Sequence, residues 1–221
     1  MLFADRRDAG RRLAAALQDR HYADPVVLAL PRGGVPVGYE IARVLPAPLD
    51  VLLVRKIGAP HQPEFGLGAV VDGAAPQIVM DEEIVRLVDP PPGYVEQEIE
   101  RQLAEIERRR HLYAGARPPL SLAGRTAIVV DDGIATGGTA RAALRAIARF
   151  SAYRVLAVPV ASDDILDAFA AEADEVVCIS RPARLHAVGA HYEDFTQTTD
   201  DEVIRLLDEA AAIWRSSTPR A

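Results

Sequence analysis

The sequence has little cysteine, little lysine and few aromatic residues, and it contains no long apolar run. Its single cysteine, Cys178, excludes an internal disulfide framework and any zinc site built from several cysteines. Cys178 lies in the apolar run 176–179, where a buried structural residue and a reactive thiol are the two alternatives. The structural interpretation is favoured because unpaired cysteines are usually enclosed in the core.

The absence of long apolar runs bears on location. No stretch approaches the ~18 consecutive apolar residues that a membrane-spanning helix needs. The segment 1–18 carries charged residues from Asp5 onward and does not look like a secretion signal. We therefore expect no membrane partner and a cytoplasmic location.

Composition and charge exclude further classes. The 221 residues are 49% apolar and 26% charged, which is the usage of a folded globular protein, and this length fits a single domain over residues 1–221. The 25 basic residues are outnumbered by 32 acidic ones. A formal net charge of −7 argues against a general nucleic-acid-binding surface, so we expect no nucleic-acid partner. The oligomeric state stays open, with a homodimer as one option.

Short apolar runs alternate with helical patterns along the chain. Several runs are uninterrupted by polar residues and rich in Val and Ile, which is typical of strands buried on both faces of a parallel sheet. We expect an α/β fold with a central, mainly parallel sheet flanked by helices. The expected strands are 26–30, 49–54, 69–71, 77–80, 126–130, 154–160 and 175–179, and the expected helices are 5–20, 35–44, 81–87, 94–113, 138–150, 162–171 and 200–215.

The strongest signal is the segment 126–144, TAIVVDDGIATGGTARAAL. An apolar run leads into two aspartates and then into a small-residue loop that opens a helical pattern. Glycines let the backbone turn tightly and approach a ligand, and the first N–H groups of a helix carry a partial positive charge of about +0.5. The loop is therefore a candidate anion cradle, with hydroxyl donors from its threonines. Its residues are Gly133, Ile134, Ala135, Thr136, Gly137, Gly138 and Thr139.

The acidic pair before this loop needs a partner of its own. Asp131 and Asp132 would repel a bare phosphate, but they can accept hydrogen bonds from a ribose diol or hold Mg²⁺ through water. A ligand with both a phosphate and a diol is a sugar phosphate. Two alternatives remain: an aspartate-capped turn into an ordinary helix, and a phosphoacceptor aspartate as in receiver domains or haloacid-dehalogenase-like phosphatases, whose D-x-D spacing is absent.

Two more loops follow strands and carry cations. The first is Pro31-Arg32-Gly33-Gly34, at the carboxyl end of a strand, where open α/β sheets bind ligands; a plain strand-to-helix turn is the alternative. The guanidinium of Arg32 suits phosphate oxygens. The second is the irregular stretch 55–68, which we expect to be a flexible binding loop. It begins with Arg55 and with Lys56, the one lysine of the chain, which is either a chance remnant or, as its place after a strand favours, a functional residue.

The segment VVDDGIATGGT resembles the phosphoribosyl pyrophosphate (PRPP) signature of type I phosphoribosyltransferases. Together with PRGG, RKIG and HYEDF it makes nearly the full chain similar to a bacterial branch of that family. The resemblance implies that the backbone of 133–139 binds the 5′-phosphate, and that Arg32 and Gly33 receive the pyrophosphate beside a cis Arg32–Gly33 bond. It also implies that Asp131 and Asp132 bind the ribose hydroxyls and, through water, Mg²⁺. Catalytic roles fall to Arg55, Lys56, Asp131 and Asp132, although no second lysine follows in the loop as it does in the orotate and adenine enzymes.

The segment 180–198 is the expected hood that would select the acceptor. Within it, Tyr192 and Phe195 either stack on a planar acceptor or pin the segment to the core. The tail 216–221 is expected to fray.

The resemblance implies Mg²⁺-dependent transfer of a phosphoribosyl group from PRPP to an unidentified nucleophile, such as a nucleobase, with release of pyrophosphate. The alternatives are a PRPP-binding regulator without transferase activity and a sugar-phosphate hydrolase or phosphatase. Pyrophosphate release from PRPP distinguishes a phosphoribosyltransferase from both of these alternatives.

Overall fold

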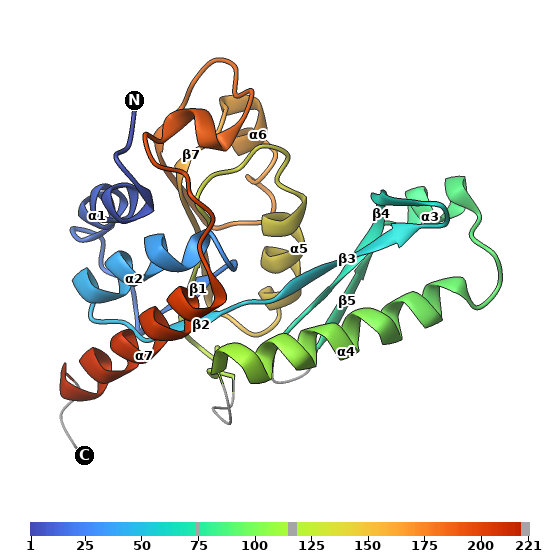
Figure 1. Cartoon of the computed structure of the whole chain (residues 1–221), viewed down its shortest axis with the longest axis horizontal. Helices are drawn as coiled ribbons and strands as arrows, with labels where there is room; N and C mark the ends of the chain where they lie inside the picture. The colour runs from blue at the N-terminus through green and yellow to red at the C-terminus, as the bar shows by residue number, and fades with distance from the viewer. Residues whose placement is uncertain (74–75, 115–118, 218–221) are drawn as a thin grey trace.

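The structure is a computed structural model that describes residues 1–73, 76–114 and 119–217. It contains a body built on a parallel sheet and a projecting arm built on an antiparallel one (Figure 1). The elements in chain order are α1 (Arg6–Leu17), β1 (Pro25–Ala29), α2 (Gly34–Val44), β2 (Leu49–Val51), β3 (Val54–Ala59), β4 (Gln62–Val71), β5 (Gln77–Met80), α3 (Glu82–Val88), α4 (Tyr94–Ala114), β6 (Thr126–Val130), α5 (Gly138–Ile147), β7 (Tyr153–Val160), α6 (Asp163–Asp167), β8 (Glu175–Ser180), the 3₁₀ helix η1 (Val188–His191) and α7 (Asp200–Ser217).

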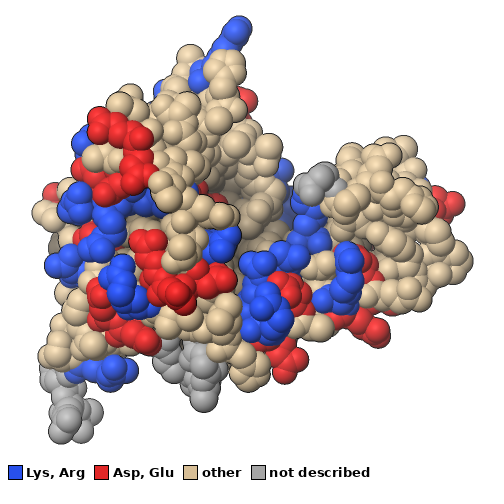
Figure 2. Space-filling view, in the orientation of Figure 1, with Lys and Arg blue, Asp and Glu red and all other residues tan. Residues whose placement is uncertain are grey.

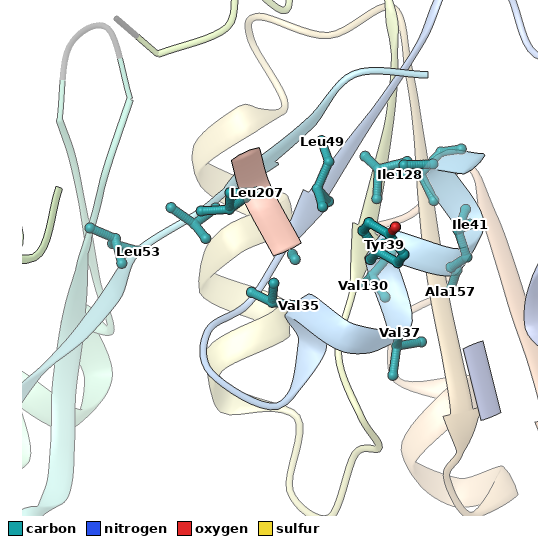
Figure 3. Close-up of a cluster of buried hydrophobic side chains, with 14 of the residues drawn as sticks. Val35, Val37, Tyr39, Ile41, Leu49, Leu53, Ile128, Val130, Ala157 and Leu207 are labelled. Atoms are coloured by element: carbon teal, nitrogen blue, oxygen red, sulfur yellow. The ribbon is translucent and has the colours of Figure 1, made fainter. Parts of the chain in front are cut away.

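The body confirms the expected α/β fold with a central parallel sheet. Its strands lie in the order β2-β1-β6-β7-β8, and each neighbouring pair is parallel. Because side chains alternate along a strand, Val27 and Ala29 of β1 face one core layer while Val26 and Leu28 face the other. Helices α1, α2 and α7 cover the first layer, part of which Figure 3 shows around α2. Helices α5 and α6 cover the second layer.

The arm corrects the expected irregular loop at 55–68. These residues lie in β3 and β4, which pair antiparallel around a turn at Pro60 and His61, and β5 completes the sheet in the order β3-β4-β5. The expected strands 69–71 and 77–80 thus belong to the arm and not to the parallel sheet. The glycines that suggested a loop permit close strand pairing: a Cβ at Gly58 would lie 2.6 Å from the Pro63 carbonyl oxygen.

Helix α4 runs along the arm and returns the chain to the body (Figure 1). Near its end, Arg110 donates from Nη2 to Asp50 Oδ2 at 2.7 Å and from Nη1 to Asp72 Oδ2 at 3.2 Å. Asp50 belongs to β2 and Asp72 follows β4 directly. This ion cluster therefore fixes α4 at the junction of the body and the arm.

The hood has two parts, of which the sequence indicated one. The segment 188–196, within the expected range 180–198, lies against the N-terminal residues that precede α1 (Figure 1). Phe3 N donates to His191 O at 2.9 Å, Glu193 N to Phe3 O at 2.8 Å, and Asp194 N to Ala4 O at 2.9 Å. These two parts, residues 3–5 and 187–199, together form the hood.

Of the tail 216–221, Ser216 and Ser217 end α7 and 218–221 lie outside the described residues. Cys178 is partly buried and burial raises the pKa of its thiol, which supports a structural role. Within the described part of the chain, no helix combines the length and apolarity needed to cross a bilayer.

Candidate active site

The small-residue loop leaves β6 and is held by its second residue. Ile134 is buried and donates from its backbone N–H to Val160 O at 2.9 Å, which ties the loop to the end of β7. Gly137 then turns the chain with a φ of +79°, and a Cβ there would lie 2.9 Å from the Phe169 ring. Glycine is required at this position for both reasons. Between these fixed points, Ala135 and Thr136 are exposed.

The start of α5 has the exposed N–H groups that the predicted anion cradle needs. Gly137 is the N-cap and supplies no side-chain cap hydrogen bond, and Arg141 N donates to Gly137 O at 2.9 Å. By helix geometry, the N–H groups of residues 138–140 precede the first repeating helical bond and point outward. Gly138 and Thr139 are exposed, so these donors are accessible to an anion.

Lys56 lies across a cavity from this cradle. The cavity measures about 410 Å³ between α5 and the arm, and its lining includes Lys56, Thr136 and Thr139. Figure 2 shows a recess between the body and the arm, with acidic and basic side chains intermixed on this face of the molecule. Arg141 and Arg145 also line the cavity, and both contact Glu172. The structure thus brings the lone lysine and the predicted phosphate loop to one cavity.

Arg55 does not join them. Its Nε donates to Gln102 Oε1 of α4 at 2.9 Å. Successive residues of a strand point to opposite faces, so Arg55 faces α4 whereas Lys56 faces α5. The predicted Arg55–Lys56 pair is therefore divided between the two faces of the arm in this conformation.

The loop after β1 packs directly on the acidic pair. A Cβ at Gly33 would collide with the Asp132 carboxylate, and a Cβ at Gly34 would lie 2.5 Å from Val130 O.

Arg32 is half-buried, and its Nη1 lies 3.6 Å from Asp200 Oδ1. The cis peptide bond joins Pro31 to Arg32 and not Arg32 to Gly33 as expected; Gly33 already has helical backbone angles as the N-cap of α2.

The acidic pair is enclosed and held by close contacts. Asp131 Oδ1 accepts from Asp132 N at 2.9 Å, and Asp132 Oδ2 accepts from Arg6 Nε at 2.7 Å. Burial, and then the charge of Asp132, raise the pKa of Asp131 well above its usual range. Burial also raises the pKa of Asp132, against the opposing effect of Arg6. Two partly buried carboxylates whose charges repel each other favour a ligand that brings hydroxyl donors or a cation.

The aromatic pair of the hood divides into two roles. Tyr192 is 6% exposed, and its hydroxyl donates to Asp132 O at 2.6 Å. Its ring lies between Phe3, at a centroid distance of 5.3 Å, and Phe195, at 5.0 Å. This favours the pinning interpretation for Tyr192. Phe195 is 37% exposed, so stacking on an acceptor stays a prediction for that ring.

Comparison with known proteins decides the family. A family model described as a phosphoribosyl transferase domain matches residues 4–192, which include all three loops and part of the hood. The chain belongs to this family. Two Mycobacterium tuberculosis proteins, from different strains and provisionally named phosphoribosyl transferases, are each 48% identical over 211 residues, or 95% of this chain. The match covers 47% of those relatives, so the chain spans about half their length.

A solved structure extends the similarity to three dimensions. The crystal structure of TT1426 from Thermus thermophilus matches with a TM-score of 0.82 and 44% sequence identity. The match covers 95% of this chain and 99% of that chain. The arm and the hood thus belong to a fold shared by the two proteins over almost their whole lengths.

Two parts of this candidate site were not identified from the sequence. Arg6 contacts Asp132 from 126 residues away, and its local sequence indicated only a charged helix start. Arg141 and Arg145, on the contrary, are four residues apart in the helix that follows the PRPP-like loop. Residues at that spacing share a helix face, so this pair could have been predicted to lie beside the cradle.

The residues present fit Mg²⁺ in the mode in which it keeps most of its water. Among the residues that the structure describes, no three His, Cys, Asp or Glu side chains are grouped as a metal site. Mg²⁺ is commonly held by one or two carboxylates together with substrate phosphates and water, so Asp131 and Asp132 are a sufficient protein contribution.

Proposed function

We propose that this phosphoribosyl transferase domain transfers a phosphoribosyl group from PRPP to a nucleophile and releases pyrophosphate. The observation that carries the proposal is the convergence of two loops from neighbouring parallel strands. Gly33 of the loop after β1 lies against the Asp132 carboxylate of the loop after β6. The acidic pair and the helix start that follows it therefore lie beside the loop after β1 at one sheet edge, which supports a binding site for a phosphorylated ribose.

The roles follow from this arrangement. The backbone of the loop 133–139 binds the 5′-phosphate, and Asp131 and Asp132 accept hydrogen bonds from the ribose hydroxyls. Arg32 and Lys56 attract the pyrophosphate. Positive charge develops on the ribose as pyrophosphate leaves, so the carboxylates stabilise an oxocarbenium-like state without a covalent nucleophile.

Asp131 and Asp132 are the residues that would hold Mg²⁺, through its water shell. When bound, Mg²⁺ supplies positive charge that offsets the negative charge building on the pyrophosphate. The raised pKa values of both carboxyls are consistent with this role, because a nearby cation favours the ionised forms that burial disfavours. The cytoplasmic location expected from the sequence is kept as part of this proposal.

The acceptor is identified by screening. We would incubate the protein with PRPP, Mg²⁺ and a panel of nucleobases and amines and measure pyrophosphate. Asp132→Asn should weaken PRPP binding or turnover, whereas the exposed Asp19→Asn should not. PRPP binding without pyrophosphate release by any acceptor would favour the regulator, and release of inorganic phosphate would favour a phosphatase. Absence of PRPP binding would remove the proposal.

A further inference from the structure

Arg6, the first residue of α1, joins three parts of the site with one side chain. Its Nε lies 2.7 Å from Asp132 Oδ2, and its Nη1 donates to Thr196 O of the hood at 2.7 Å. Its Cζ lies 3.9 Å from the centroid of the Phe195 ring. The side chain is 11% exposed, so these contacts are made largely out of water.

The surrounding backbone fixes where Arg6 points. Asp5 caps α1 by accepting from Asp8 N at 2.6 Å, so the helix begins at Arg6. The two residues before Asp5 pair with the C-terminal part of the hood, through Phe3 N to His191 O and Asp194 N to Ala4 O, both at 2.9 Å. Arg6 is therefore anchored on both sides of its own Cα, and little conformational freedom is lost when its fork engages its two acceptors.

Among the charged groups around Asp132, Arg6 is the cation that forms an ion pair with its carboxylate. Asp131 repels it from the same loop, and Tyr192 binds its carbonyl oxygen and not its carboxylate. Arg32, on the neighbouring loop, is directed to Asp200. A guanidinium held on one carboxylate oxygen restricts the orientation of that carboxylate and leaves its other oxygen for a ligand.

We propose that Arg6 is a positioning residue for phosphoribosyl transfer. It holds the Asp132 carboxylate in the orientation that accepts the ribose hydroxyls, and it ties that carboxylate to the hood, so that the ribose site and the hood keep a fixed relation. The inference rests on the proposed function. It differs from a purely structural role because Arg6 acts on PRPP through Asp132.

A double-mutant cycle tests this dependence. PRPP binding in the presence of Mg²⁺ would be measured by calorimetry for the wild type, Arg6→Ala, Asp132→Asn and the double variant. We expect Arg6→Ala to weaken binding about 10-fold, as for loss of a charged hydrogen bond. In the Asp132→Asn background the same substitution should have little further effect, because the residue through which Arg6 acts is already changed.

Two further variants keep the test decisive if Arg6→Ala folds poorly. Arg6→Lys keeps the charge but not the fork, and it should bind PRPP within about 3-fold of wild type while slowing turnover more strongly. Arg11→Ala is the matched control, since Arg11 is 56% exposed on the same helix and makes ion pairs only at 3.8 Å. It should match wild type.

The outcomes separate the inference from the proposed function. The positioning role is wrong if Arg6→Ala weakens PRPP binding by the same factor in the wild type and in the Asp132→Asn background. It is also wrong if the Arg6→Ala variant binds PRPP with wild-type affinity. Lower thermal stability with unchanged PRPP affinity would identify Arg6 as structural only. If the wild type binds no PRPP, the proposed function fails and this inference fails with it.

Discussion

The position of Lys56 in the structure supports a role in binding an anion. It lies on a strand of the arm and faces the anion cradle across a cavity, so it can approach an anion bound between them. Lys56→Ala should reduce turnover about 10²- to 10³-fold, the usual cost of losing a positioned stabiliser, with a smaller loss of PRPP affinity. Steady-state kinetics beside calorimetry would measure both.

Arg205→Ala is the control for Lys56, because it also removes one cation and Arg205 is exposed on α7. It should leave both quantities unchanged. Equal turnover in Lys56→Ala and wild type would show that the lysine is dispensable.

Gly33 shows how little room separates the loop after β1 from the loop after β6. A methyl group at Gly33 would collide with the Asp132 carboxylate. Gly33→Ala should therefore lower the free energy of unfolding by about 1–3 kcal/mol, as overpacking does, and weaken PRPP binding. Gly138→Ala is the stability control, because a Cβ there meets nothing within 4 Å. Equal denaturation midpoints for Gly33→Ala and Gly138→Ala would contradict the packing argument.

At the scale of elements, the arm shows where sequence patterns were ambiguous. The inner strands β1, β6 and most of β7 were predictable because both of their faces are buried and their apolar runs are nearly continuous. Strands β3 and β4 contain glycine, proline and cations, which normally indicate a loop, and they pair because their glycines allow close backbone contact. That pairing depends on the partner strand, so the local sequence could not reveal it.

The junction between arm and body carries a pH-dependent contribution to stability. Burial raises the pKa of Asp72, although Arg110 acts in the opposite direction. A carboxyl whose pKa is raised by folding holds its proton more tightly in the folded state. The free energy of unfolding therefore falls as pH rises from the unfolded value, near 3.8, through the folded pKa.

Asp72→Asn should remove that fall. The amide can still accept from Gly73 N, and Arg110 keeps its contact with Asp50. We expect the difference in unfolding free energy, variant minus wild type, to increase between pH 4 and pH 8 in urea titrations. Asp167→Asn, which removes an exposed carboxylate on α6, is the control. A variant that loses stability equally at both pH values would mean that the Asp72 charge is not disfavoured.

At the scale of the whole molecule, the site combines predictable and unpredictable parts. The loop 133–139 and the acidic pair were identified because their chemistry is local in sequence. The contribution of Arg6, the two-part hood and the separation of Arg55 from Lys56 depend on contacts between distant segments. No local pattern encodes those contacts, since they arise only when the sheet brings the segments together.

The acidic pair also sets a balance between stability and function for the whole domain. Burial and the neighbouring charge raise the pKa of Asp131, which means that its ionised form is disfavoured without a ligand. Asp131→Asn should therefore raise the free energy of unfolding of the ligand-free protein at pH 8, by about 1 kcal/mol.

The wild type should gain stability when PRPP and Mg²⁺ are added, about 2.7 kcal/mol at a hundred times Kd. Asp131→Asn should gain much less, because the ligand loses a hydroxyl and cation partner. Thermal unfolding with and without PRPP would show both effects, and a variant that is less stable alone yet equally stabilised by PRPP would contradict the assignment of Asp131 to the ligand site.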